Sequence, residues 1–311
     1  MRPNRRQLEE PSEELKASPA EAYSWLSVPR WFLWEGGFLL LGRGTGVVPP
    51  HAHHAIQIVI ALEGSMVVCG RDGKWRDACG IIVKPDMVHS FDCRGASAAM
   101  LFVDPESTEG AWLRAALRHD ITVVPEARLA SCIWEIRAFN EKPFESMDVQ
   151  TLIRHCVQEL SPGAAPSRRL DPRVTDVLAA IRASDDLRIS LADAAKKAFL
   201  SPSRFAHLFK HQMGLPFSRY MLWRKLTRAM VAIASERTIA AAAHAADFAD
   251  AAHLTRTFYQ MVGMAPSALM YGEFARIASP FDLSGERIPA RATAGSSPTA
   301  IDSRRHRLSS S

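Results

Sequence analysis

The chain has 311 residues, of which 47% are hydrophobic and 23% charged, a composition typical of a globular protein and long enough for two domains. Its formal net charge is +5, and no apolar run approaches the roughly 18 residues that a membrane span needs. The N-terminus contains arginines with no apolar stretch behind them, so we expect no secretory signal. The five cysteines form no C-x-x-C pair, which predicts reduced thiols in the cytoplasm.

The charge is unevenly distributed. Residues 1–167 carry 17 Lys and Arg against 21 Asp and Glu, a net charge of −4. Residues 168–278 carry 16 against 9, a net of +7, and residues 279–311 carry 5 against 3, a net of +2. A basic segment beside an acidic one indicates that only the second half meets a polyanion. Charge alone leaves chance scatter as an equally good explanation.

The first elements in chain order are strands. We expect residues 1–20, which are polar and contain proline, to be disordered. Between Phe38 and Val103 lie short runs rich in Val, Ile and Leu, bounded by Gly or Pro clusters. The runs include FLLLG, IQIVIAL, SMVVCG, GIIVKP and AAMLFVD. Because no helical pattern separates them, we expect residues 21–106 to form an antiparallel all-β sandwich or barrel.

A histidine-rich segment, PPHAHHAIQIVIALEG, lies within this region, and KPDMVHSF follows it. His51, His53 and Gln57 are odd-numbered on one extended segment, so period-two alternation sends them to one face. His54 then points to the opposite face and is not expected to be a ligand. We predict that His51, His53, Gln57 and His89 converge inside the barrel.

The spacing of these residues resembles the two motifs of the cupin barrel. In metal-binding cupins, two His and a Glu from the first motif join one His from the second around a metal. Here Gln57 takes the Glu position, and a neutral amide is a weaker ligand than a carboxylate. We therefore expect an effector site lined by His51, His53, Gln57 and His89, with no cofactor. A divalent metal on His51, His53 and His89 is the alternative.

The pattern becomes helical after the strands. Residues 107–160 include Leu152, Cys156 and Leu160 at i, i+4 and i+8. We expect this region to be a helical dimerisation and linker region in a homodimer. The segment SPGAAPSRR, residues 161–169, is a linker by composition.

From Pro172 to Ile277 the sequence reads as helical, and one short helix is written twice. LSPSRFAHLFKHQMG, Leu200 to Gly214, is matched by FADAAHLTRTFYQMVG, Phe248 to Gly263. Phe209 and Phe258 correspond at an offset of 49 residues, the difference between their numbers. Two copies at one offset are difficult to obtain by chance, although either copy alone would be a weak signal.

Each copy has the features of a helix-turn-helix. A short alanine-rich helix comes first, and Ser201 or Asp250 then provides the N-cap of the next helix. The segment between the copies, Phe217 to Ala234, reads as one helix of about 27 Å at ~1.5 Å per residue. Such a rod can hold two reading helices about one DNA turn apart. We expect residues 171–278 to form an all-α domain whose two helices enter successive major grooves, and residues 279–311 to be disordered.

These residues also resemble the AraC/XylS family of bacterial transcription regulators, over about Asp171 to Tyr271. The shared elements include SPSRFAHLFK, KLTRA and HLTRTF, with Gly214 and Gly263. Asp247 stands where the family usually has Gly, which predicts a strained or looser second turn. The resemblance places base contacts at Ser203, Ala206, His207, Ala251, Ala252 and Arg256. We expect Arg204, which flanks the first set, and Lys210 to contact DNA as well.

Five cations of this domain suit phosphate contacts, which set affinity and register rather than sequence. They are Lys196, Lys197, Lys210, Arg224 and Arg228. For each of them, a solvated surface charge is an equally good explanation.

The order of the domains predicts a cytoplasmic transcription regulator rather than an enzyme. A small-molecule effector binds the barrel, shifts the population of dimer geometries, and changes how the last domain holds promoter double-stranded DNA. RNA polymerase is a further expected partner, and a membrane is not. Two rivals stay open: a metal-dependent cupin enzyme fused to a helical domain, and an architectural DNA binder that senses nothing. Metal analysis and a turnover screen, compared with a promoter gel shift, distinguish the cupin enzyme from the regulator. The absence of any response to small molecules would favour the architectural DNA binder.

Overall fold

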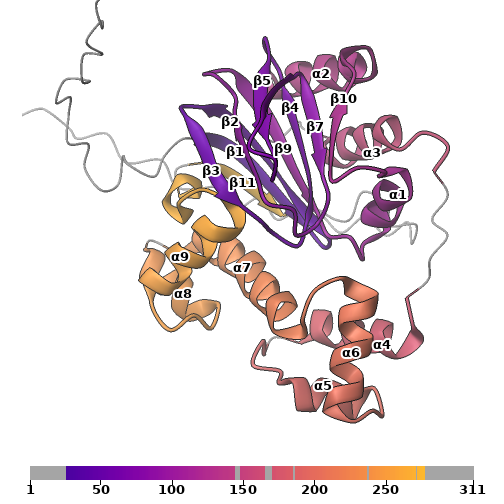
Figure 1. Cartoon of the computed structure of the whole chain (residues 1–311). Helices are drawn as coiled ribbons and strands as arrows, with labels where there is room; N and C mark the ends of the chain where they lie inside the picture. The colour runs from indigo at the N-terminus through magenta and orange to yellow at the C-terminus, as the bar shows by residue number, and fades with distance from the viewer. Residues whose placement is uncertain are drawn as a thin grey trace, which may run out of the picture.

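The computed structural model describes residues 26–143, 148–164, 170–184, 186–236, 238–270 and 272–276. Within these ranges, a sheet-rich N-terminal region is followed by a helical C-terminal region, as the sequence predicts (Figure 1). The expected disordered segments, residues 1–20 and 279–311, lie outside the described residues, as do residues 165–169 of the expected linker. In the described part of the chain, no helix combines the length and hydrophobicity that a membrane span requires.

Two sheets form the N-terminal region. Among the described residues, the larger sheet has seven strands in the order β10-β7-β4-β9-β2-β1-β11, and the smaller has four in the order β3-β8-β5-β6. The strands are β1 Leu26–Trp34, β2 Gly37–Gly44, β3 Val47–His51, β4 Ile56–Ala61, β5 Met66–Cys69, β6 Trp75–Ala78, β7 Gly80–Val83, β8 His89–Asp92, β9 Ser97–Val103, β10 Ile121–Val124 and β11 Glu273–Arg276. Every residue of β4 is buried, because both faces of the larger sheet are covered.

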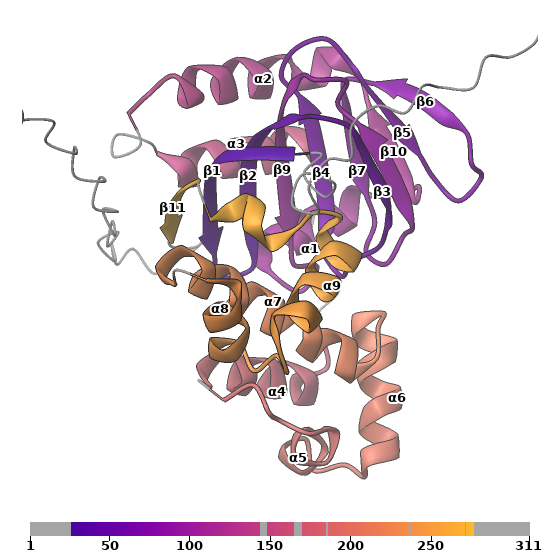
Figure 2. The same ribbon diagram turned by 90° about the vertical axis from the view of Figure 1, so that its left-hand side faces the viewer.

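Three helices cover the outer face of the larger sheet (Figures 1 and 2). They are α1 Thr108–Ala116, α2 Glu126–Asn140 and α3 Val149–Leu160. Ile56 and Ile58 of β4 share a core with Leu129 of α2 and Ile153 of α3. The helical expectation for residues 107–160 is wrong in one place, because β10 lies between α1 and α2. Its sequence, ITVV, consists entirely of β-branched residues, and it pairs with β7 to form one edge of the larger sheet.

The C-terminal region contains six α-helices and one 3₁₀-helix among its described residues. They are α4 Pro172–Ala183, α5 Leu191–Lys197, α6 Pro202–Met213, α7 Phe217–Ser235, α8 Ile239–Ala245, α9 Ala251–Val262 and η3 Pro266–Leu269. The single long helix predicted between the two copies is confirmed as α7. Helices α4, α5 and α6 and the first half of α7 have a core of their own, built on Phe205, Phe209 and Tyr220.

The two reading-helix candidates, α6 and α9, begin and end in the same way. The Ser201 side chain accepts a hydrogen bond from the Arg204 backbone N–H, and the Asp250 side chain accepts one from the His253 backbone N–H. Both helices end on a left-handed glycine, Gly214 with φ 85° and Gly263 with φ 76°. Glycine adopts this conformation with no steric cost from a Cβ, which explains why both copies end on that residue.

The second half of α7, with α8 and α9, packs against the sheets rather than standing apart from them (Figure 2). Trp223 and Met230 of α7 and Phe258 of α9 belong to the same hydrophobic core as Phe38 and Phe102 of the larger sheet. The expected all-α domain therefore shares a core with the sheet-rich region.

The end of the described chain joins the larger sheet. Residues 171–278 were expected to be entirely helical, but Glu273–Arg276 forms β11 and pairs parallel with β1 (Figure 2). The indole N–H of Trp31 in β1 donates to the backbone oxygen of Leu269 at 3.2 Å and holds η3 beside this edge. The short sequence EFAR carries no strand signal of its own. The pairing is decided by the backbone groups that the edge of β1 leaves available.

Candidate DNA-binding face and histidine cluster

The predicted DNA-contact residues lie on the outward faces of α6 and α9, and none of the eight is buried. Ser203, Arg204, His207, Lys210, Ala252 and Arg256 are exposed, and Ala206 and Ala251 are half-buried. The inner faces are fixed by apolar side chains, because Phe205, Phe209, Leu254 and Phe258 are fully buried. Packing thus leaves the polar face of each helix open to a partner.

One predicted phosphate contact is misplaced. Arg224 lies on the side of α7 that faces the sheet-rich region, where it forms an ion pair with Glu35 at 3.4 Å. Its side chain is only 14% exposed, so it does not reach the surface that α6 and α9 present. The helical wheel of α7 could not show this, because a cation at an interdomain contact has the same spacing as one on a DNA-binding face.

The turns before α6 and α9 each contain one residue with positive φ. Asp247 has φ 58° in the second turn, where the sequence predicts strain, and Phe199 has φ 55° in the first. The backbone N–H of the next residue reaches back to a carbonyl five residues earlier in both turns, Leu200 to Ala195 and Phe248 to Ala243. The two turns therefore begin alike, although the second contains one more residue before its reading helix.

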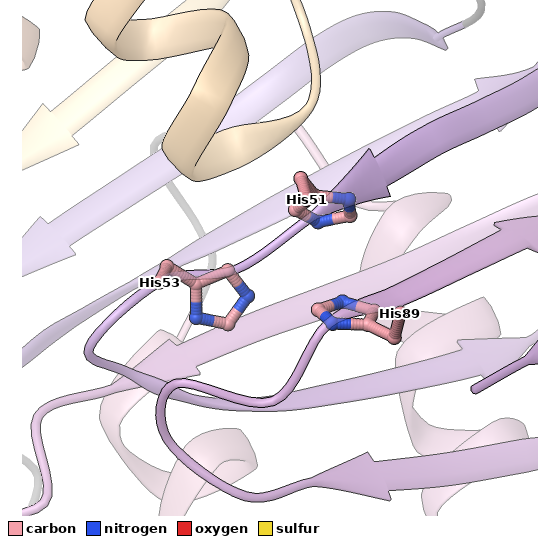
Figure 3. A group of neighbouring side chains, drawn as sticks. All are labelled: His51, His53 and His89. Carbon is pink, nitrogen blue, oxygen red and sulfur yellow. The ribbon is translucent and has the colours of Figure 1, made fainter. Parts of the chain in front are cut away.

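The structure brings together the four side chains predicted as the effector site, and Figure 3 shows its three histidines. His51, His53, His89 and Gln57 are all buried. The three histidines each direct one ring nitrogen toward the others, and these nitrogens lie within 4.8 Å of one another. The Oε1 atom of Gln57 lies 3.0 Å from Nε2 of His53 and 2.5 Å from Nε2 of His89.

The reason for this convergence differs from the one that the sequence suggested. His51, His53 and Gln57 do not share one strand: His51 ends β3 in the smaller sheet, and Gln57 lies in β4 of the larger sheet. His53 lies on the connection between them. His89 starts β8 directly opposite His51 in the antiparallel pairing of β3 and β8. The cluster forms because the chain crosses here from one sheet to the other.

Burial keeps the three imidazoles neutral. Loss of solvent, followed by repulsion from neighbouring histidines, lowers the pKa of His53 to about 3 and holds the pKa of His51 well below its ordinary value. Burial also lowers the pKa of His89 to about 4. Each Nδ1 lies 2.9 Å from a backbone oxygen, which belongs to Pro49, Ala55 or Met87. Nδ1–H therefore donates in each ring, and Nε2 is left with a lone pair.

Four acceptor atoms would then face one another, three imidazole Nε2 atoms and the Gln57 oxygen. Two arrangements reduce the repulsion between these acceptors. In one, the Gln57 amide is turned over so that its NH₂ group donates to both His53 and His89, and Nε2 of His51 is left without a hydrogen bond. In the other, the three imidazole nitrogens and the Gln57 oxygen would hold a divalent cation. Donation of Nδ1–H to a backbone carbonyl is the usual support for metal-binding histidines, so the residues fit a metal as well.

Comparisons with known proteins identify the C-terminal part of the chain. Residues 194–270 match the family described as a helix-turn-helix domain. A probable transcriptional regulator of Photobacterium leiognathi, LumQ, is 31% identical over 85 residues, which are 27% of this chain and 34% of the relative. The segment is an AraC-type helix-turn-helix domain. The alignment spans about a third of the relative's length, so it concerns this domain alone.

One solved structure has a similar fold over more of the chain. ToxT of Vibrio cholerae, in its apo form, has a TM-score of 0.50 at 12% identity, covering 73% of this chain and 92% of that chain. A regulator with an AraC-type DNA-binding domain from Chromobacterium violaceum is 23% identical over 32% of this chain and 89% of its own, with a TM-score of 0.30. The ToxT likeness supports the two-part layout, a sheet-rich region followed by helices.

A buried ionic cluster that sequence reasoning missed lies between the sheets and the AraC-type domain. His54 Nε2 is 2.9 Å from Glu106 Oε2, and both side chains are almost fully buried. Burial by itself would lower the pKa of His54, but the charge and hydrogen bond of Glu106 outweigh it and raise that pKa. The sequence indicated only that His54 points away from His53. The Asp-Pro-Glu run at 104–106, directly after an apolar strand, was the available signal.

Asp104 extends this cluster to α7, the long helix between the two copies of the repeated helix. The Trp223 indole N–H donates to Asp104 Oδ1 at 2.7 Å, and the ring of Tyr220 lies 6.0 Å from that of His54. Burial, followed by the charge of Glu106, raises the pKa of Asp104 to about 6. Asp104 of the sheet-rich region is therefore paired with a side chain of the central helix of the AraC-type domain.

Proposed function

We propose that this protein is a sequence-specific DNA-binding transcription regulator that responds to a small-molecule effector. The observation that carries the proposal is the pair of capped helices α6 and α9, held on one long helix with their polar faces outward, within an AraC-type domain. We take residues 171–278 as the DNA-binding domain with two helix-turn-helix motifs, and residues 21–106 as a cupin-like sensing barrel. Residues 107–160 would be the dimerisation and linker region.

The helices α6 and α9 are proposed to enter successive major grooves of promoter DNA. Arg256 can offer two N–H donors to guanine O6 and N7, and His207 can form one bond to a base edge. The exposed Lys196, Lys197 and Lys210 would contact phosphates, whereas Arg224 is withdrawn from that role by its ion pair with Glu35. RNA polymerase and a second copy of the chain remain proposed partners.

The histidine cluster is proposed as the effector site because it touches the DNA-binding domain directly. A Cβ placed on Gly263, the residue that ends α9, would lie 2.8 Å from Val48 Cγ1 and 3.1 Å from His51 Nδ1. The rings of His53 and Trp223 in α7 lie 6.2 Å apart. An occupant larger than an ion would have to separate β3 from α9. Such an occupant changes the relative stability of two domain arrangements, which is the physical requirement for a population shift.

The experiment that tests the DNA-binding part is selection of duplexes from a random pool by the full-length protein, followed by footprinting. A single enriched motif with two protected segments about one helical turn apart is expected. The same selection with Arg256→Ala should lose the motif in one half only. Recovery of random sequence would contradict the proposal and favour an architectural DNA binder.

The sensing part is tested by His53→Ala and His89→Ala in a reporter assay. We expect both variants to lose the inducer response and to retain basal promoter binding, because neither residue lies on α6 or α9. Cobalt titration of the purified protein, read by visible absorption, distinguishes a metal effector from an organic one. The matched family and the relative support a regulator, and a metal-bound protein with substrate turnover would instead favour the cupin enzyme.

A further inference from the structure

Phe199, in the turn between α5 and α6, combines two unfavourable features. Its side chain is 95% exposed, more than any other large hydrophobic residue in the described part of the chain. Its backbone φ is 55°, in the left-handed region that bulky residues avoid. A single exposed apolar side chain needs no explanation, but one that also holds a strained backbone does.

The second copy of the motif supplies an internal comparison. Asp247 occupies the corresponding place in the turn before α9, with φ 58°. The backbone N–H of Phe199 donates to Lys196 and that of Asp247 to His244, both at 3.1 Å, so the two turns impose the same conformation. Asp is among the residues that tolerate left-handed φ, and it is hydrophilic. The first turn carries a phenylalanine where neither backbone geometry nor solvent favours it.

The surroundings of Phe199 indicate what covers the ring. Lys196 and Lys197, in the last turn of α5, are exposed, as are Ser203 and Arg204 in the first turn of α6. In helix-turn-helix proteins the N-terminal end of the second helix meets base edges, while the first helix crosses the sugar-phosphate backbone. The turn between the two helices therefore lies at the rim of the groove, next to both phosphates and deoxyribose.

We propose that Phe199 is a DNA-contacting residue of the first helix pair, whose ring packs on the deoxyribose and base edges at the rim of the groove that α6 enters. The neighbouring lysines hold the phosphates on either side, and the ring excludes water between them. This inference rests on the proposed function and adds to it a contact made by the turn rather than by the reading helix. The second turn makes no equivalent apolar contact, because the carboxylate of Asp247 repels the phosphate backbone of the DNA. The two halves of the binding site therefore differ in how they are held.

Four full-length variants test the proposal on a duplex that the wild-type protein has selected from a random pool. Phe199→Gly removes the ring and the strain together, and Phe199→Tyr keeps the ring. Asp247→Gly is the matched control, since it places glycine at the corresponding left-handed position without removing a ring. Ser235→Ala, at the far end of α7, controls for surface substitution.

We expect Phe199→Gly to unfold at the same temperature as wild type or higher, and to bind the selected duplex about tenfold more weakly, because a ring that is covered in the complex is lost. Phe199→Tyr should bind within about twofold of wild type, since it keeps the apolar ring surface. Asp247→Gly should gain thermal stability and lose no affinity. Unchanged affinity of Phe199→Gly would overturn the proposal.

A photo-crosslinking amino acid, p-benzoyl-phenylalanine, placed at position 199 gives a second readout. Crosslinks to the strand at the edge of the footprint are expected. Crosslinks to RNA polymerase, with none to DNA, would assign the ring to a protein partner and overturn the proposal. Failure of the wild-type protein to select any duplex would overturn the proposed function itself, which is a different result from a defect confined to Phe199.

Discussion

Trp223 of α7 donates its indole N–H to the buried carboxylate of Asp104 at 2.7 Å, across 119 residues of sequence. The bond joins the central helix of the DNA-binding domain to the end of strand β9 in the larger sheet. Trp223 also lies 6.0 Å from Phe38 and 6.2 Å from His53, measured between ring centroids. One side chain thus contacts the ionic cluster, the common hydrophobic core and the histidine cluster.

Replacing Trp223 with Phe should destabilise the protein, because the ring is kept while the donor to Asp104 is lost. A buried carboxylate without a partner costs about 1–3 kcal/mol. Urea denaturation measures the free energy of unfolding. Trp134→Phe is the control, since Trp134 is 70% exposed and its replacement should change that free energy by less than about 0.5 kcal/mol. If both substitutions change the free energy of unfolding equally, the hydrogen bond to Asp104 does not stabilise the protein.

The His54–Glu106 pair predicts a loss of stability at alkaline pH. The pKa of His54 is raised above 6.5 in the folded protein. Its contribution to the free energy of unfolding is therefore complete below pH 6.5 and is lost as the pH rises through the pKa of the folded state. The pKa of Glu106 is lowered from 4.5, because the charge and hydrogen bond of His54 outweigh burial. Its contribution is therefore present above pH 4.5 and is lost only as the pH falls through the folded value.

Thermal melts between about pH 5 and 9 check this prediction. The wild-type melting temperature should fall on the alkaline side, and His54→Gln should flatten that fall. His119→Gln serves as the control, because His119 is exposed. A His54→Gln profile with the same alkaline slope as wild type would show that another group controls the pH dependence.

Gly263→Ala and Gly214→Ala together isolate the contact between α9 and the histidine cluster. Both glycines end a helix in the left-handed conformation, so each alanine costs about 1–2 kcal/mol of backbone strain. A Cβ at Gly214 meets nothing within 4 Å, whereas one at Gly263 would lie 2.8 Å from Val48. Gly263→Ala should therefore be more destabilising by about 1–3 kcal/mol. Identical losses in the two variants would mean that α9 moves freely away from β3.

Arg256→Ala should weaken binding to the selected duplex and barely affect random duplex. Loss of one bidentate contact to guanine costs about 1–3 kcal/mol of discrimination. Fluorescence anisotropy at two salt concentrations provides both affinities and the salt dependence. Lys210→Ala is the comparison, since a phosphate contact contributes equally on every sequence and reduces the salt slope by about one. If Arg256→Ala instead lowers both affinities alike, Arg256 contacts phosphate.

The local elements follow from short-range chemistry, and the sequence was sufficient for them. Ser201 and Asp250 cap α6 and α9, and Gly214 and Gly263 end them, because capping and left-handed φ depend on one or two residues. The repeat offset and the long apolar stripe of α7 then predict two outward-facing helices on one rod. Asp247 has the positive φ expected at a position where the family usually has Gly.

What the tertiary structure decided lies where distant segments meet. The alternation of side chains along a strand predicts a common face for His51 and Gln57 only if both lie on one strand. It does not predict that the chain crosses from one sheet to the other between them. The strand β11, the burial of Arg224 against Glu35 and the His54–Glu106 pair likewise depend on partners more than 50 residues away, at 243, 189 and 52 residues. Burial turns such contacts into large energies, because an ion or a backbone group removed from water must find its partner inside the fold.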